Sequence, residues 1–116
     1  MSLDVILTQL QPVSVYNQNI THNLSKMAAE VKVNWEGRTL TLYDILWHAD
    51  KHGFTQAHEI AEFLDVGWNL LLADPHKFRQ FNPPNGWGNY DNLCDFVYQY
   101  RNACWDNPQA SIEISR

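Results

Sequence analysis

Hydrophobic residues recur at helical spacing in several stretches of this chain. Apolar side chains three or four positions apart predict amphipathic helices over residues 20–30, 42–53, 57–71 and 90–106, with a short helical turn at 75–81. Asn19 is expected to cap the first of these helices and Thr55 the third. Thr41 and Asp44 have the spacing of a capping box before the second helix, and Asn89 precedes the last.

Both ends of the chain show strand patterns instead. Residues 5–7 and 13–16 are rich in β-branched residues, and residues 111–115 alternate polar and apolar side chains. We expect these terminal strands to pair in one small antiparallel sheet, and a short hairpin is predicted over residues 31–40. The predicted fold is therefore a helix-rich α+β domain, and residues 1–116 form a single domain because no linker or repeat divides them.

One loop differs from the rest of the chain in composition. The run Asn82-Pro83-Pro84-Asn85-Gly86-Trp87-Gly88 lies between two predicted helices and places a tryptophan between two glycines. The prolines end the preceding helix because they fix φ and lack an N–H, and Asn85-Gly86 is a strong turn dipeptide. In such a constrained loop Trp87 would present a large amphipathic surface. Burial in the core between the helices is the ordinary alternative.

The charge of the protein narrows the classes of partner. Its 13 acidic and 8 basic residues give a formal charge of −5, which argues against nucleic-acid binding because that requires a positive surface. No apolar run is long enough to cross a bilayer, and the N-terminus lacks a signal-peptide pattern. We expect no membrane partner and a cytoplasmic location. No cofactor-binding fingerprint occurs in the sequence.

Polar residues cluster at the start of the first predicted helix. Asn19, Thr21, His22, Asn23 and Lys26 lie within one short segment. A helix N-terminus has unpaired N–H groups and a partial positive charge, and His22 with Lys26 would add donors for a phosphate or carboxylate. Ordinary helix capping on a solvated face explains the same residues without a ligand.

Histidine and cysteine residues give weaker signals. Asp44, His48 and His52 recur four positions apart, and two imidazoles at that spacing can share a metal ion. No glutamate base accompanies them, so they are interpreted as a solvated helix face and no metal is assigned.

Cys94 and Cys104 lie about 15 Å apart along one helix, too far for a disulfide. Acidic neighbours are expected to raise the pKa of both thiols, which disfavours thiol catalysis.

Separated blocks of the sequence resemble a known pattern. The blocks are Asn19-Ile20-Thr21-His22-Asn23-Leu24 with Met27-Ala28, Leu42-Tyr43-x-x-Leu46-Trp47, Phe81-Asn82-Pro83-x-Asn85-Gly86-Trp87-Gly88-x-Tyr90, and Ser111–Arg116. In order and spacing they resemble an uncharacterised family of small proteins from bacteria and their phages. The resemblance implies kinship but no established activity. Residues 32–40 interrupt the pattern, and His48-Ala49 replaces its Arg-Pro pair, so the histidine row lies outside the shared blocks.

The shared blocks combine polar side chains with an aromatic wall, as a small-molecule pocket requires. They predict a pocket for a small polar ligand between the first helix and the Gly-Trp-Gly loop, formed by Asn19, Thr21, His22, Asn23, Lys26, Asn85, Trp87 and Tyr90. Two alternatives remain open. The chain can be a module that docks on a host protein through an aromatic patch at Trp35, Trp47 or Trp105, or a small enzyme with His22 as general acid or base.

Overall fold

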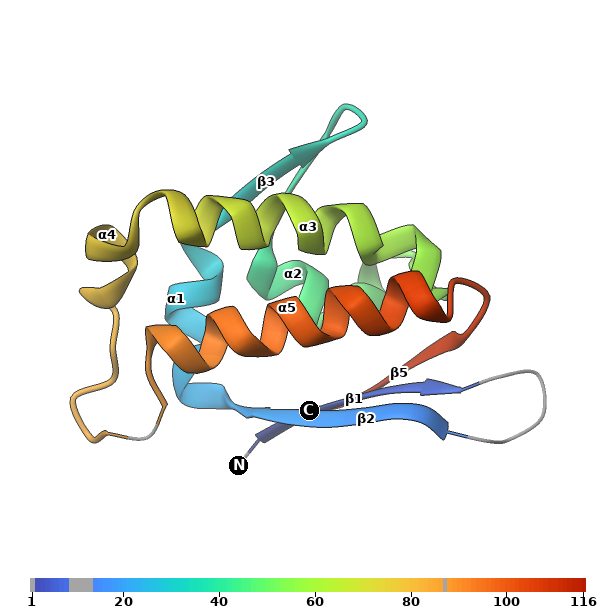
Figure 1. Ribbon diagram of the computed structural model, residues 1–116, viewed down its shortest axis with the longest axis horizontal. Coiled ribbons are helices and arrows are strands. Elements are labelled where there is room, and N and C mark those ends of the chain that lie inside the picture. The colour runs from blue at the N-terminus through green and yellow to red at the C-terminus, as the bar shows by residue number, and fades with distance from the viewer. Residues whose placement is uncertain (1, 9–13, 87) are drawn as a thin grey trace.

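Two long helices above a small sheet form the frame of the molecule (Figure 1). The computed structural model describes residues 2–8, 14–86 and 88–116. In chain order the elements are β1 (Ser2–Thr8), β2 (Ser14–Thr21), the 3-10 helix η1 (His22–Leu24), α1 (Ser25–Ala29), β3 (Lys32–Trp35), β4 (Arg38–Thr41), α2 (Leu42–Trp47), the 3-10 helix η2 (Ala49–His52), α3 (Ala57–Ala73), α4 (Pro75–Arg79), α5 (Tyr90–Asp106) and β5 (Ser111–Ser115). The fold is α+β, as the sequence predicts.

The three-stranded sheet joins the two ends of the chain. Its strand order is β2-β1-β5 with both pairings antiparallel, and Asp4 of the central strand lies opposite Ser115 of β5. Leu3, Val5 and Leu7 are fully buried and alternate with partly exposed residues. One face of the sheet therefore packs against the helices while the other faces solvent. The predicted pairing of the terminal strands is confirmed.

The first helix begins later than predicted. Ile20 belongs to β2, where it pairs with Leu3 of the central strand, and it is 6% exposed. The prediction of a helix over residues 20–30 is therefore wrong at its start, and helical structure begins at His22. Ile20 and Leu24 reach the core in either conformation, so their spacing does not decide between helix and strand. The backbone of β1 supplies hydrogen-bond partners, which favours the strand.

Two helix N-caps also differ from those predicted. Thr21 caps η1 by accepting a hydrogen bond from a backbone N–H at 3.3 Å, whereas Asn19 lies within β2. Gln56 takes the N-cap position of α3 that was expected for Thr55. The carboxylate of Glu59 accepts the backbone N–H of both Thr55 and Gln56, at 2.9 and 2.8 Å. The cap of α3 is therefore built from an acceptor inside the helix.

The other helices begin where the sequence predicts. Thr41 and Asp44 exchange side chain to backbone hydrogen bonds of 3.0 and 3.1 Å at the start of α2. Asn89 and Asn92 form the equivalent pair, at 2.9 Å in both directions, at the start of α5. Asp74 accepts a backbone N–H at the start of α4. These caps satisfy N–H groups that the first helical turn leaves unpaired.

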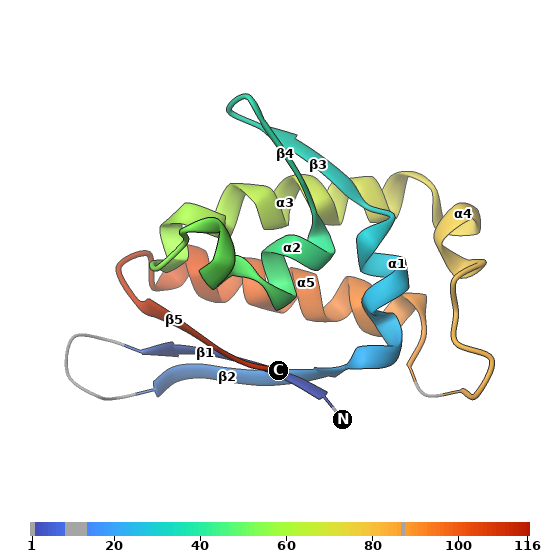
Figure 2. The same cartoon turned by 180° about the vertical axis from the view of Figure 1, so that it is seen from behind.

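The middle of the chain contains the predicted hairpin and a broken helix. β3 and β4 pair around a turn at Glu36-Gly37. The helix predicted over residues 42–53 is interrupted at His48, whose φ of −135° and ψ of 29° are not helical, and the chain continues as η2. Figure 2 shows α1 and α2 covering the back of the α3 and α5 pair, while the hairpin crosses α3 and projects beyond it.

Close packing fixes α2 against α3. A Cβ built on Gly67 of α3 would lie 2.5 Å from Leu42 Cδ2, so the absence of a side chain permits this approach. Leu42, Ile60 and Leu64 are completely buried in the core that results. Within the described ranges, no helix combines the length and apolarity that crossing a membrane requires.

Candidate functional site

The loop between α4 and α5 is closed by a bond between its two ends and packs against Thr21 and Leu24. Asn82 Oδ1 accepts the backbone N–H of Tyr90 at 2.8 Å. Gly88 has a φ of +91°, and a Cβ built on it would lie 2.7 Å from Thr21 Cγ2. A side chain at position 88 would meet Thr21 and would also require left-handed backbone geometry, so glycine is needed there. The loop therefore stays close to the segment that follows β2.

A groove of about 460 Å³ lies between this loop and residues 22–26. We call it the loop groove. Its lining residues are His22, Asn23, Ser25 and Lys26 on one side and Gln80, Phe81, Asn82, Pro83, Pro84 and Asn85 on the other. The volume falls within the ~300–1,000 Å³ of small-molecule sites. Four residues of the predicted pocket are thus brought together: His22, Asn23, Lys26 and Asn85.

The loop groove combines polar and apolar lining with one positive charge. Lys26 is the only formally charged side chain among its described lining residues. No carboxylate in the described part of the chain lies within ion-pair distance of the Lys26 ammonium. The lining includes four side-chain amides, which can donate and accept hydrogen bonds, while Phe81 and the two prolines supply apolar surface. This arrangement suits a small molecule with an anionic group and a flat apolar part.

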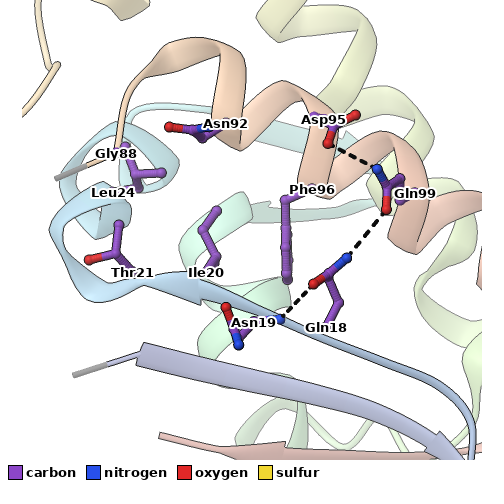
Figure 3. A pocket seen from close by; sticks show the side chains of 10 residues that line it. All are labelled: Gln18, Asn19, Ile20, Thr21, Leu24, Gly88, Asn92, Asp95, Phe96 and Gln99. Atoms are coloured by element: carbon purple, nitrogen blue, oxygen red, sulfur yellow. Dashed lines mark hydrogen bonds between the residues drawn. The ribbon is translucent and has the colours of Figure 1, made fainter.

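Asn19 and Thr21 line a second hollow, of about 260 Å³, between β2 and α5. Figure 3 shows that Gln18, Gln99 and Asp95 in its lining are joined by hydrogen bonds. Gln18 accepts the backbone N–H of Asn19 at 3.3 Å and donates to Gln99 at 3.4 Å, and Gln99 donates to Asp95 at 2.9 Å. Because these side chains satisfy one another's hydrogen-bonding groups, we interpret the hollow as a structural contact between β2 and α5 and not as a ligand site. The structure thus separates Asn19 and Thr21 from the other predicted pocket residues.

Tyr90 belongs to the core and lines neither groove. It is 4% exposed, its hydroxyl donates a hydrogen bond to the carbonyl oxygen of Leu71 at 2.5 Å, and Arg79 lies 4.9 Å from its ring centroid. Burial raises the pKa of the phenol. The assignment of Tyr90 to the pocket is therefore corrected. Trp87 lies outside the described residues, and its part in the pocket stays a prediction.

His22 is oriented by an aromatic neighbour rather than by an acid. Its ring meets Trp47 edge-on, with the centroids 6.1 Å apart and the planes at 75°. His22 Nε2 is buried and has no hydrogen-bond partner among the described residues. A general base is normally oriented by a carboxylate or carbonyl, and none bonds to this atom in the described structure. The geometry thus adds no support for catalysis by His22.

The aromatic residues named for protein docking differ in exposure. Trp47 is only 3% exposed and Trp35 is half-buried, whereas Trp105 is 45% exposed. Trp47 therefore cannot form a docking patch, and the alternative of docking on a host protein depends mainly on Trp105.

The two histidines of the predicted second helix, which lie just after α2 in the structure, contact different partners. His48 Nε2 lies 2.9 Å from the hydroxyl of Tyr43, and His52 Nε2 lies 3.5 Å from Asp44 Oδ1. Burial is the main cause that lowers the pKa of His48, which favours the neutral ring. Across the described residues, no group of three or more His, Cys, Asp or Glu side chains is arranged to hold a metal ion.

Both cysteines are free thiols in α5. Burial raises the pKa of Cys104 to about 12 and also raises that of Cys94. The direction of the shift agrees with the sequence expectation, but its main cause is loss of solvent rather than acidic neighbours. Neither thiol has the lowered pKa of a nucleophile.

Sequence reasoning missed most of the loop wall. Residues 80–84 line the loop groove, whereas the sequence predicts Asn85, Trp87 and Tyr90 from this side, and of these only Asn85 is among the described lining residues. The sequence signal for the others is the concentration of amide side chains around Pro83-Pro84. A proline pair ends the helix before it, and the exposed residues on either side then become available to line a groove.

Comparisons with known proteins assign no family to this fold and site. No family model matches the chain. Searches of curated proteins and of solved structures also find no match. The functional interpretation therefore depends on the geometry of the loop groove.

Proposed function

We propose that the protein binds a small polar ligand with an anionic group in the loop groove. The observation that carries this proposal is the position of Lys26, in a groove of about 460 Å³ without a carboxylate among the described lining residues. A cation that has no carboxylate partner among the described residues gains most from a ligand that supplies the opposite charge. The negative formal charge of the whole chain makes this local positive site more distinctive.

The remaining lining supports a ligand with a second, less polar part. Asn82 Oδ1 is engaged by the backbone of Tyr90, which leaves its amide N–H₂ as a donor. Phe81 is half-buried beside Pro83 and Pro84. Flat apolar side chains of this kind can pack against a ring of the ligand, while amides determine its orientation. An acid with a planar ring, such as a nucleotide or an aromatic acid, combines these features.

A binding role fits the site better than a catalytic one. In the described residues His22 lacks an orienting acid, both thiols have raised pKa values, and no metal-holding cluster is present. Catalysis requires at least one group whose protonation or charge is matched to the reaction. The loop groove supplies recognition groups instead.

The proposal also covers the family relationship and the cellular compartment of the protein. Part of each wall of the loop groove comes from the blocks that resemble small bacterial and phage proteins, namely His22 and Asn23 on one side and Phe81 to Asn85 on the other, whereas Lys26 lies outside the blocks. We propose that the chain belongs among these proteins and that these parts of the site are shared. The free thiols Cys94 and Cys104 support a reducing compartment such as the cytoplasm.

The proposal can be tested by direct binding measurements. Native mass spectrometry of the protein purified from its own host would identify a retained small molecule. Calorimetry with inorganic phosphate and adenosine monophosphate would then compare the wild type with Lys26→Gln. We expect roughly tenfold weaker binding in this variant, because a hydrogen bond to a charged group contributes about 1.5–3 kcal/mol.

Lys32→Gln is the matched control, since Lys32 is an exposed lysine on β3 and does not line the loop groove. Its affinity should equal that of the wild type. Equal losses in the two variants would mean that net charge alone attracts the anion. If neither probe binds and no molecule is retained on purification, the proposed function is wrong.

A further inference from the structure

Four side chains form a cluster on the outer side of the two long helices. The guanidinium of Arg101 lies 4.6 Å from the ring centroid of Trp68, 4.9 Å from that of Tyr98 and 4.6 Å from that of Trp105. Trp68 and Tyr98 also contact each other, with their centroids 5.2 Å apart. The cation thus holds three aromatic rings in fixed positions, one from α3 and two from α5.

The charge of Arg101 is neutralised within the protein. Its Nη1 lies 3.0 Å from Asp65 Oδ1, and its Nε and Nη2 donate to Asn102 Oδ1 at 3.2 and 3.0 Å. Only 8% of Arg101 is exposed. Arg101 is therefore a support for the rings, and its charge is not available to an external anion.

Two of the three rings that Arg101 supports are unusually accessible, while Trp68 is half-buried. Trp105 is 45% exposed and Tyr98 is 41% exposed. Large hydrophobic side chains with such exposure in the described residues all lie on α3 or α5, namely Leu70, Leu72, Tyr98 and Trp105. Trp and Tyr held rigidly at a surface are the residues that dominate binding energy at protein interfaces.

Helical spacing gathers these residues on one surface. Asp65, Trp68 and Leu72 follow one another at intervals of three and four on α3, as do Tyr98, Arg101 and Trp105 on α5. We call these six residues the helix-pair face. The back of the same two helices is covered by α1 and α2 (Figure 2), so the face lies on the open side of the pair.

The charged residues of the two long helices are almost all acidic. Of the 13 acidic and 8 basic residues of the chain, α3 and α5 contain six acidic ones and one basic one, so they carry the whole formal charge of −5. The single basic residue is Arg101, which is paired internally. Glu62, Asp95 and Asp106 lie one turn from Asp65, Tyr98 and Asn102 respectively. Glu62 and Asp95 therefore lie one turn from members of the helix-pair face, and Asp106 directly follows Trp105 in the sequence.

We propose that the helix-pair face docks a basic segment of a partner protein. Arginine side chains of the partner stack their guanidinium groups on the outer surfaces of Trp105 and Tyr98, and further basic side chains of the segment reach the carboxylates near the face. A second copy of this chain fits less well, since the α3 and α5 pair carries a formal charge of −5 and two such pairs repel each other. This inference is independent of the loop groove.

A binding experiment with two defined peptides tests the proposal. Fluorescein-labelled nona-arginine and nona-lysine are titrated with the wild-type protein, and fluorescence anisotropy is recorded. We expect nona-arginine to bind more tightly, because guanidinium groups stack on aromatic rings better than ammonium groups do. Trp105→Ala should weaken nona-arginine binding roughly fivefold, as expected for loss of one exposed cation–π contact with its ring packing. Equal affinity for the two peptides would overturn the proposal.

Matched variants separate the face from general charge attraction. Trp35→Ala removes a half-buried tryptophan from the hairpin, and its affinity should match the wild type. Asp106→Lys should weaken binding more than Glu36→Lys, which makes the same charge change in the turn of the hairpin. This second pair of variants decides the question if Trp105→Ala does not fold. Equal effects within either pair overturn the proposal, as does a wild-type dimer that is lost in Trp105→Ala.

Discussion

Replacing Gly88 with alanine tests the close contact that positions the loop. Gly88 has a φ of +91°, and a new Cβ would lie 2.7 Å from Thr21 Cγ2 and 3.1 Å from Leu24 Cγ. Leu24 is completely buried, so it has little room to move. The substitution therefore combines backbone strain with a steric clash. It should also shift the loop wall away from residues 22–26 and weaken any ligand of the loop groove.

The size of the effect follows from three opposing contributions. Left-handed geometry costs a non-glycine residue roughly 1–2 kcal/mol. Overpacking at a filled site costs roughly 1–3 kcal/mol. Alanine also restricts the unfolded chain, which offsets roughly 0.4–1 kcal/mol of the loss. The free energy of unfolding should thus fall by about 2–4 kcal/mol.

Gly86→Ala provides the matched control, because Gly86 has a φ of +75° but no atom within 4 Å of its built Cβ. Only the strain applies there, so the expected loss is about 0.5–1 kcal/mol after the offset. Urea unfolding followed by far-UV circular dichroism measures both values. If the two variants lose the same free energy within about 0.5 kcal/mol, the contact between Gly88 and Thr21 does not constrain the loop.

Three further predictions concern pH, thiol chemistry and capping. Backbone hydrogen bonds hold the pKa of Glu59 below its ordinary 4.5, so their stabilisation is present above that value and is lost as pH falls through the lower folded pKa. The urea midpoint of Glu59→Gln should accordingly fall less between pH 6 and pH 3 than that of the wild type, and identical profiles would contradict this. Cys104 has a pKa of about 12 and is buried, so Ellman's reagent at pH 8 should label it only after unfolding, and peptide mass spectrometry of the native protein would reveal any earlier reaction. Thr41→Ala should lose about 1 kcal/mol in urea unfolding, whereas the exposed Thr39→Ala should lose less than half of that.

Features determined by near neighbours in the sequence were predictable. The caps at Thr41 and Asn89 each need an acceptor and a partner three residues away, and both pairs form as expected. Ile20 shows the opposite case. Its conformation is decided by Leu3 on another strand, and apolar spacing within its own segment contains no information about that partner.

The candidate site was predictable only in part, for a similar reason. His22, Asn23 and Lys26 are polar residues of one short exposed segment, and their meeting with Asn85 follows from the constrained loop. Tyr90 has an equally amphipathic side chain, but its hydroxyl finds the carbonyl oxygen of Leu71 inside the core. Whether a tyrosine binds a ligand or a backbone group depends on which acceptor the fold places beside it.

The central position of β1 constrains the order in which the sheet of this protein can form. One neighbour of β1 is the adjacent strand β2, but the other, β5, contains residues as late in the chain as Ser115. Pairings between such distant residues form slowly, because a long loop must close before any contact rewards it. During synthesis on the ribosome, one edge of β1 therefore stays unpaired until β5 has been made. Until then, a competing strand or a chaperone can bind that edge.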